Sequence, residues 1–140
     1  MIRVELERKS GDYGFVAVDE FGNNIQTDSS PANGGLNFGI RPMQLLLMAL
    51  GSCSAIDIVS ILKKQKQEIT GFRIEINGVR EEGKEPSLWK NISLHFYLDG
   101  IVDTEKASRA CSLSLEKYCS VAETLRRGGT IIDWKVTVNK

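Results

Sequence analysis

The sequence predicts an α+β fold in which mostly antiparallel strands surround one long buried helix, within a single domain over residues 1–140. Apolar and polar residues alternate in several consecutive segments, as they do in half-buried strands. Helical spacing is confined to one long segment near the middle of the chain and a shorter one near its end. Consecutive strands separated by few helices favour antiparallel pairing over a doubly wound parallel sheet. The expected order is therefore βββ-α-ββ-α-β.

The strands are expected where side chains alternate with a period of two. Three such segments precede the central helix and form a meander, two lie between the helices, and one closes the chain. Turn-forming residues separate them. The segments are residues 2–8, 13–18, 25–28, 72–76, 92–98 and 132–138.

The central helix is expected from Pro42 to about Gln67. Pro42 falls in the first turn, where its missing N–H removes no helical hydrogen bond. Residues 42–62 are also long enough to cross a bilayer. Because an unpaired aspartate at mid-membrane costs about 3 kcal/mol, Asp57 favours the alternative, a helix buried in the core of a globular domain.

A second helix is expected to begin at Asp103 or Thr104, either of which can cap its first amide groups. Its apolar residues recur at intervals of three and four, as on one buried helical face. Residues 126–129, Arg-Arg-Gly-Gly, mark its end. The expected buried stripe consists of Ala107, Ala110, Cys111, Leu115, Tyr118 and Ala122.

Charge and cysteine content narrow the class of protein. Eighteen Lys and Arg residues balance 18 Asp and Glu residues, so no broad electrostatic field draws the protein to nucleic acid or an anionic membrane. We therefore expect the protein to bind neither nucleic acid nor a membrane. Three cysteines without close spacing argue against a secreted disulfide framework. A cytoplasmic location is expected. In that reducing compartment any disulfide would form transiently during a reaction and would not stabilise the fold.

Cys53, in the middle of the central helix, has two interpretations. A free cysteine in an apolar helix can pack as a small hydrophobic residue. This structural role alone would explain why Cys53 lies in a helix of mostly apolar residues. Catalysis is the alternative, because Gly51 and Ser52 thin the helix beside the thiol and Asp57 lies one turn further on the same face. The glycine-rich residues 33–39 are expected to form the mouth of a pocket.

The other two cysteines lie in the second helix. Cys111 is on its apolar stripe, so a structural role is expected there. Cys119 lies one residue off that stripe, and spacing alone does not indicate whether it meets Cys53.

Two motifs resemble those of the OsmC/Ohr family, the osmotically inducible and organic hydroperoxide resistance proteins. Residues 41–55, RPMQLLLMALGSCSA, are similar to the family's central-helix motif, in which a proline opens the helix and a small residue precedes a cysteine. Residues 118–125, YCSVAETL, resemble its second cysteine motif. The element order matches as well, so the resemblance covers nearly the whole chain. The phrase PMQLLLMALG is most similar to the YhfA-like branch.

The resemblance implies an OsmC-like fold and an intertwined homodimer with its sites at the subunit interface. It also implies a thiol peroxidase, in which Cys53 attacks the peroxide and Cys119 resolves the sulfenic acid as a disulfide. A dithiol would then reduce the enzyme. An apolar pocket would favour organic hydroperoxides as substrates, in defence against oxidative or osmotic stress.

The activating residues of the family are not matched. Its well-studied peroxidases use an arginine from the N-terminal strands and a glutamate directly after the helix-opening proline. Here Met43 follows Pro42, and residues 13–28 contain no arginine. Arg41 is the nearest candidate cation for stabilising a Cys53 thiolate, and Asp57 is the candidate carboxylate for orienting it.

No cofactor and no metal site are expected, because the single histidine, His95, cannot supply a usual metal-binding set. Two alternatives to the peroxidase stay open. One is a non-enzymatic module that binds an apolar ligand at the dimer interface. The other is a stress-related dimer whose cysteines sense redox state.

Overall fold

The computed structural model describes residues 1–139, which divide into two compact units, Met1–Leu46 and a second unit that begins at Leu47. Each unit contains one three-stranded sheet, and helix α1, Pro42–Lys64, begins in the first unit and continues through the second. The predicted α+β class is confirmed. The single domain expected from the sequence stays a prediction.

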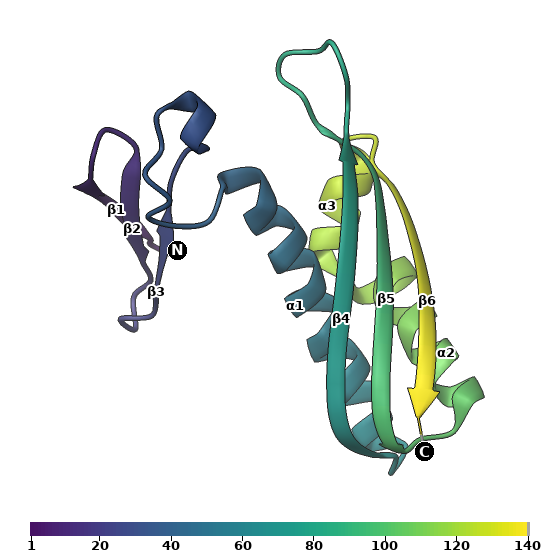
Figure 1. Ribbon diagram of the computed structural model, residues 1–140. Helices are drawn as coiled ribbons and strands as arrows, with labels where there is room; N and C mark the ends of the chain where they lie inside the picture. The colour runs from purple at the N-terminus through teal and green to yellow at the C-terminus, as the bar shows by residue number, and fades with distance from the viewer. Residues whose placement is uncertain (140) are drawn as a thin grey trace. The chain divides into compact units, whose positions relative to one another are not determined.

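The first unit is an antiparallel meander of β1 (Glu5–Ser10), β2 (Gly14–Val18) and β3 (Asn24–Thr27), shown in Figure 1. Strand β1 begins at Glu5, later than predicted. Glu5 pairs with Val18, and because Val18 is the last residue of β2, residues before Glu5 have no partner in that strand. The turn between β2 and β3 is closed by the Asp19 carboxylate, which accepts hydrogen bonds from the Phe21 and Asn23 amides at 2.8 and 2.9 Å.

Asp28 organises the glycine-rich loop that follows β3. It is 2% exposed, and its carboxylate accepts hydrogen bonds from the amides of Leu36 at 2.9 Å, Phe38 at 3.1 Å and Ser29 at 2.7 Å. These amides, Leu36 first, hold the pKa of Asp28 below its usual value. The loop is therefore folded around one charged side chain and includes a short 3₁₀ helix, Pro31–Asn33.

The sheet of the second unit is mixed. Strands β4 (Glu68–Arg80) and β5 (Trp89–Ile101) form a long antiparallel hairpin, and β6 (Ile131–Asn139) pairs with β5 in parallel. A parallel pair needs a crossover connection, which helices α2 (Thr104–Leu113) and α3 (Ser120–Arg127) provide. Figure 1 shows the helices of this unit on one face of the sheet.

Both hairpin strands are longer than predicted. The backbone ladder continues through residues 68–71 and 99–101, where side chains do not alternate cleanly and the sequence offers no strand signal. The predicted alternation in β5 is confirmed, because four of its apolar residues are at most 1% exposed. They are Ile92, Leu94, Phe96 and Leu98.

Helix α1 approaches the sheet closely through Gly51. A Cβ at Gly51 would lie 2.7 Å from Cδ1 of Ile76 in β4, so glycine permits the helix and sheet to pack. The expected role of Gly51, opening the helix beside Cys53, is wrong, because this residue is buried against the sheet. Ser52 is exposed.

By length and composition alone, α1 could cross a membrane. In the structure Leu50, Ile58 and Leu62 are fully buried in the second unit. The helix thus contributes to the core of an α+β fold, as predicted from Asp57 and the surrounding strands.

Candidate functional site

The predicted second helix is interrupted, and the interruption positions Cys119. Helix α2 ends at Leu113, one π-helical turn η2 spans Ser114–Tyr118, and Cys119 is extended with φ −74° and ψ 106° before α3 begins. The continuous helix expected from residues 103–127 is therefore wrong. One feature of the sequence could have indicated this break. Cys119 lies off the apolar stripe, and a π turn shifts the residues after it to a different face of the helix.

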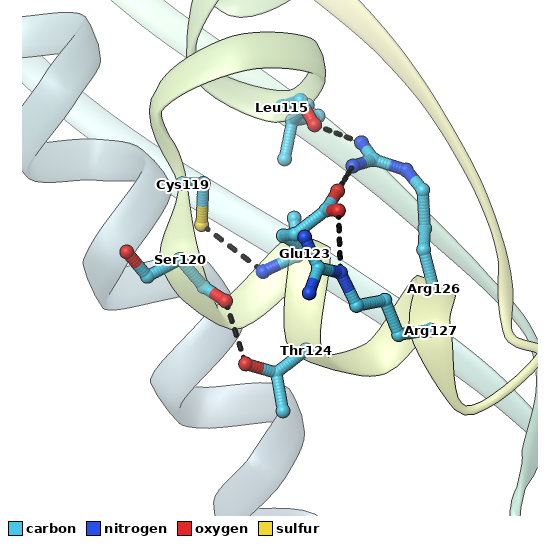
Figure 2. Close-up of polar contacts among 8 residues, drawn as sticks. Leu115, Cys119, Ser120, Glu123, Thr124, Arg126 and Arg127 are labelled. Carbon is cyan, nitrogen blue, oxygen red and sulfur yellow. Dashed lines mark hydrogen bonds and ion pairs between the residues drawn. The ribbon is translucent and has the colours of Figure 1, made fainter.

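The Cys119 side chain itself begins α3. Its Sγ accepts a hydrogen bond from the Ala122 amide at 3.4 Å, while its own amide donates to the Ser114 carbonyl at 2.7 Å. Figure 2 shows the sulfur at this helix start, next to the hydrogen bond from the Thr124 hydroxyl to the Ser120 carbonyl at 2.8 Å. The thiol is held at the N-terminus of a helix by hydrogen bonds on both sides of the residue.

Charged residues tie α3 to the π turn. Arg126 donates to the Leu115 carbonyl and lies 3.6 Å from Glu123, whose carboxylate also binds Arg127 at 2.9 Å (Figure 2). The network holds the segment that presents Cys119.

Cys53, Asp57 and Cys119 meet in the second unit. Their sulfur atoms and a carboxylate oxygen all lie within 4.8 Å of one another. The Ser114 hydroxyl donates to Asp57 at 2.9 Å and also approaches the Ser54 carbonyl at 3.3 Å. The structure therefore brings together two cysteines that are distant in the sequence, together with the carboxylate identified on the helix.

The two thiols differ in their surroundings. Cys119 is 3% exposed, whereas Cys53 is half-buried. Burial raises the pKa of Cys119 to about 11; the Ala122 amide opposes this rise and the neighbouring Cys53 adds to it. Cys119 is therefore a protonated thiol near neutral pH, and Cys53 is the more accessible sulfur.

Cys111 has the structural position that the sequence predicts. It is fully buried in α2, and burial raises the pKa of its thiol to about 12. Such a thiol is inert near neutral pH.

Two hollows are lined by residues of this site. Asp57 lines one of about 390 Å³ together with Lys64 and Tyr118. Cys119 lines a second, of about 330 Å³, with Lys117 and Tyr118. Each hollow therefore has a site residue and a lysine in its wall.

Arg41 lies in the first unit. Its guanidinium donates to the Asn37 side chain at 3.1 Å and to the Gly39 carbonyl at 3.3 Å, and its charge contributes to the low pKa of Asp28. Its assignment as the activating cation stays a prediction.

Ser114 is the site residue that sequence reasoning missed. It is fully buried and contacts Asp57. The available signal was a hydroxyl between the apolar positions of the second helix, where an unpaired polar group would be unfavourable.

Comparisons with known proteins identify relatives of this chain. Residues 33–135 match the family described as OsmC-like protein. Protein YhfA of Escherichia coli K12 is 44% identical over 91 residues, which cover 64% of this chain and 67% of YhfA. A hypothetical protein from Aquifex aeolicus is 34% identical with a TM-score of 0.80, covering 100% of this chain and 98% of its own.

A more distant structure shares the fold. It is an organic hydroperoxide resistance protein OsmC from Legionella pneumophila, 16% identical with a TM-score of 0.74, covering 99% of this chain and 97% of its own. With the match spanning most of its length and both units of its structure, the chain belongs to the OsmC-like protein family.

Proposed function

We propose that this protein is a thiol peroxidase that reduces organic hydroperoxides, with Cys53 as the peroxidatic cysteine and Cys119 as the resolving one. One observation carries the proposal: the two sulfurs lie within 4.8 Å of each other, although Cys53 lies within α1 and Cys119 directly precedes α3. The similarity to the organic hydroperoxide resistance protein from Legionella supports the substrate class.

The chemistry requires two steps. The Cys53 thiolate attacks the distal peroxide oxygen, the O–O bond breaks, and the leaving alkoxide takes a proton to become an alcohol. Cys53 is then a sulfenic acid. The Cys119 sulfur attacks it, an S–S bond forms, and water leaves; a dithiol later reduces this disulfide. The sulfurs lose two electrons and the peroxide gains them.

The different burial of the two thiols supports these roles. The half-buried Cys53 is the sulfur that a substrate can reach, and the buried Cys119 faces its partner rather than solvent. With its pKa raised to about 11, Cys119 stays protonated and unreactive toward peroxide until a sulfenic acid forms beside it.

Asp57 and Arg41 are the proposed activating residues. Asp57 lies within 4.8 Å of both sulfurs and is the proposed carboxylate that orients the activating cation. A carboxylate by itself does not stabilise a thiolate, so a cation is needed, and Arg41 is proposed for that role.

A homodimer is proposed because α1 leaves apolar side chains uncovered. Met48 is 50% exposed, Ile56 65% and Val59 40%, and their spacing places them on one face of the helix. A second copy that buried this stripe would remove it from water. A cytoplasmic location and a dithiol reductant complete the proposal.

The test is peroxide consumption by the purified, reduced protein. We expect cumene hydroperoxide to be consumed in the presence of dithiothreitol, and Cys53→Ser to abolish turnover. Cys119→Ser should still form a sulfenic acid at Cys53, detectable by dimedone labelling, but no disulfide.

Cys111→Ala is the matched control, because it removes a thiol outside the pair and should keep turnover. Absence of peroxide consumption in the parent protein would contradict the proposal. If an apolar ligand then copurified with the protein, the non-enzymatic binding module would be favoured; the uncovered apolar stripe on α1 is the observation that supports it.

A further inference from the structure

Cys53, Asp57 and Cys119 present a mixed set of sulfur and oxygen ligands to one space. Their ligand atoms lie within 4.8 Å of one another. Tetrahedral zinc, with Zn–S near 2.3 Å and Zn–O near 2.1 Å, holds its ligand atoms about 3.6–3.8 Å apart. Movements of about 1 Å at the side-chain ends would bring the three groups to these separations.

The ligands are carried by ordered backbone. Cys53 and Asp57 are one turn apart on α1, the i,i+4 spacing that places two ligands on the same side of a helix. Cys119 is fixed by the Ser114 carbonyl at 2.7 Å and the Ala122 amide at 3.4 Å. No large rearrangement is needed to assemble a three-ligand site.

Ser114 orients two of the three ligands through hydrogen bonds. Its buried hydroxyl donates to Asp57 at 2.9 Å, and its carbonyl accepts the Cys119 amide. One residue thereby supports two of the ligands. Hydrogen bonding to ligating carboxylates is a regular feature of metal sites.

Charge favours a cation at this position. Two thiolates and a carboxylate compensate the charge of a divalent ion, and a bound ion in turn stabilises the thiolates that ligate it. Thiolate ligands favour zinc over magnesium or calcium, and three protein ligands leave a fourth position for water.

We propose that the reduced protein binds one zinc ion through Cys53, Asp57 and Cys119. Binding occupies both sulfurs, so zinc protects them from alkylation and from oxidation to a disulfide. The site does not depend on the proposed peroxidase activity, and a protein without that activity would bind the metal equally well.

The experiment is titration of the reduced full chain with Co²⁺, followed by displacement with Zn²⁺. We expect one metal ion per chain, with thiolate-to-cobalt charge-transfer bands and the intense visible bands of tetrahedral cobalt. Cys53→Ser and Cys119→Ser should each lose the one-per-chain site. Asp57→Asn should weaken zinc affinity at least about tenfold, the scale seen when metal-site residues are changed.

Matched variants separate this site from other ligands. Cys111→Ala should bind as the parent does, because Cys111 lies outside the cluster. Asp133→Asn, at an exposed position of β6, should also leave affinity unchanged. Circular dichroism of each variant identifies any that fail to fold.

A second measurement uses the parent protein alone. One equivalent of Zn²⁺ should protect Cys53 and Cys119 from iodoacetamide, as read by peptide mass spectrometry. The site is overturned if no thiolate–cobalt bands appear, if one ion is shared by two chains, or if folded Asp57→Asn binds zinc as tightly as the parent. Loss of peroxidase activity alone has no bearing on these outcomes.

Discussion

At the scale of single residues, the three cysteines have the same side chain and different environments. Cys53 is half-buried, Cys119 is 3% exposed, and Cys111 is fully buried. Desolvation disfavours a thiolate, so it raises the pKa of Cys119 to about 11 and that of Cys111 to about 12. The three thiols therefore differ in accessibility and reactivity because their environments differ.

We expect alkylation to follow this order. At pH 7 iodoacetamide should label Cys53 first, Cys119 more slowly and Cys111 last. Because a thiolate fraction falls tenfold for each pH unit below the pKa, raising the pH from 7 to 9 should accelerate labelling of Cys119 about 100-fold. Peptide mass spectrometry measures each rate. Equal labelling of Cys53 and Cys119 at pH 7 would contradict the assignment.

Asp57 shows how a single polar residue can be noticed in a sequence before its purpose is known. Its place in an apolar helix argued against a membrane span and marked it as a candidate site residue. The partners that define its role, Ser114 and Cys119, belong to another part of the chain. No spacing rule connects them with Asp57.

At the scale of elements, α1 depends on a close approach to β4 at Gly51. Gly51→Val should destabilise the protein by about 1–3 kcal/mol, because overpacking displaces neighbouring side chains. The nearest atom is Cδ1 of Ile76, so Ile76→Val, which removes that atom, should recover part of the loss. Urea unfolding of the single and double variants measures both effects. Additive effects in the double variant would refute the contact.

The loop after β3 depends on the ionised Asp28. Because its folded-state pKa is lowered from the ordinary value of 3.8, its stabilisation is present above that value and is lost as the pH falls through the folded pKa. Asp28→Asn should therefore lower the melting temperature at pH 7, and the difference from the parent should shrink below about pH 4.

Thermal unfolding across this pH range tests the role of Asp28. Asp12→Asn, an exposed position in the same unit, is the matched control and should melt like the parent at both pH values. A pH-independent effect of Asp28→Asn would show that charge is not the cause.

At the scale of the whole molecule, the uncovered stripe on α1 predicts association. Ile56→Glu should place a charge in the proposed interface and shift the protein from dimer to monomer in analytical ultracentrifugation. Ile101→Glu is the matched control, since Ile101 is 75% exposed at the end of β5. A monomeric parent protein, or a dimeric Ile56→Glu variant, would exclude this interface.

The sequence by itself determined the order of the strands, the core helix and the family. These depend on local periodicity and contiguous motifs, which each segment carries within itself. The lengths of β4 and β5 were less accessible, because partner strands extend a ladder beyond the segments that alternate.

Only the tertiary structure decided the arrangement at Cys53 and Cys119. The break at Ser114–Tyr118 turns Cys119 out of the helical register, and the approach of two helices brings Asp57 and Ser114 beside the sulfurs. Contacts between distant segments depend on how whole elements pack. The local motifs therefore identified Cys53 and Cys119 as candidate residues. Only the packing of the elements shows that they form one site with Asp57.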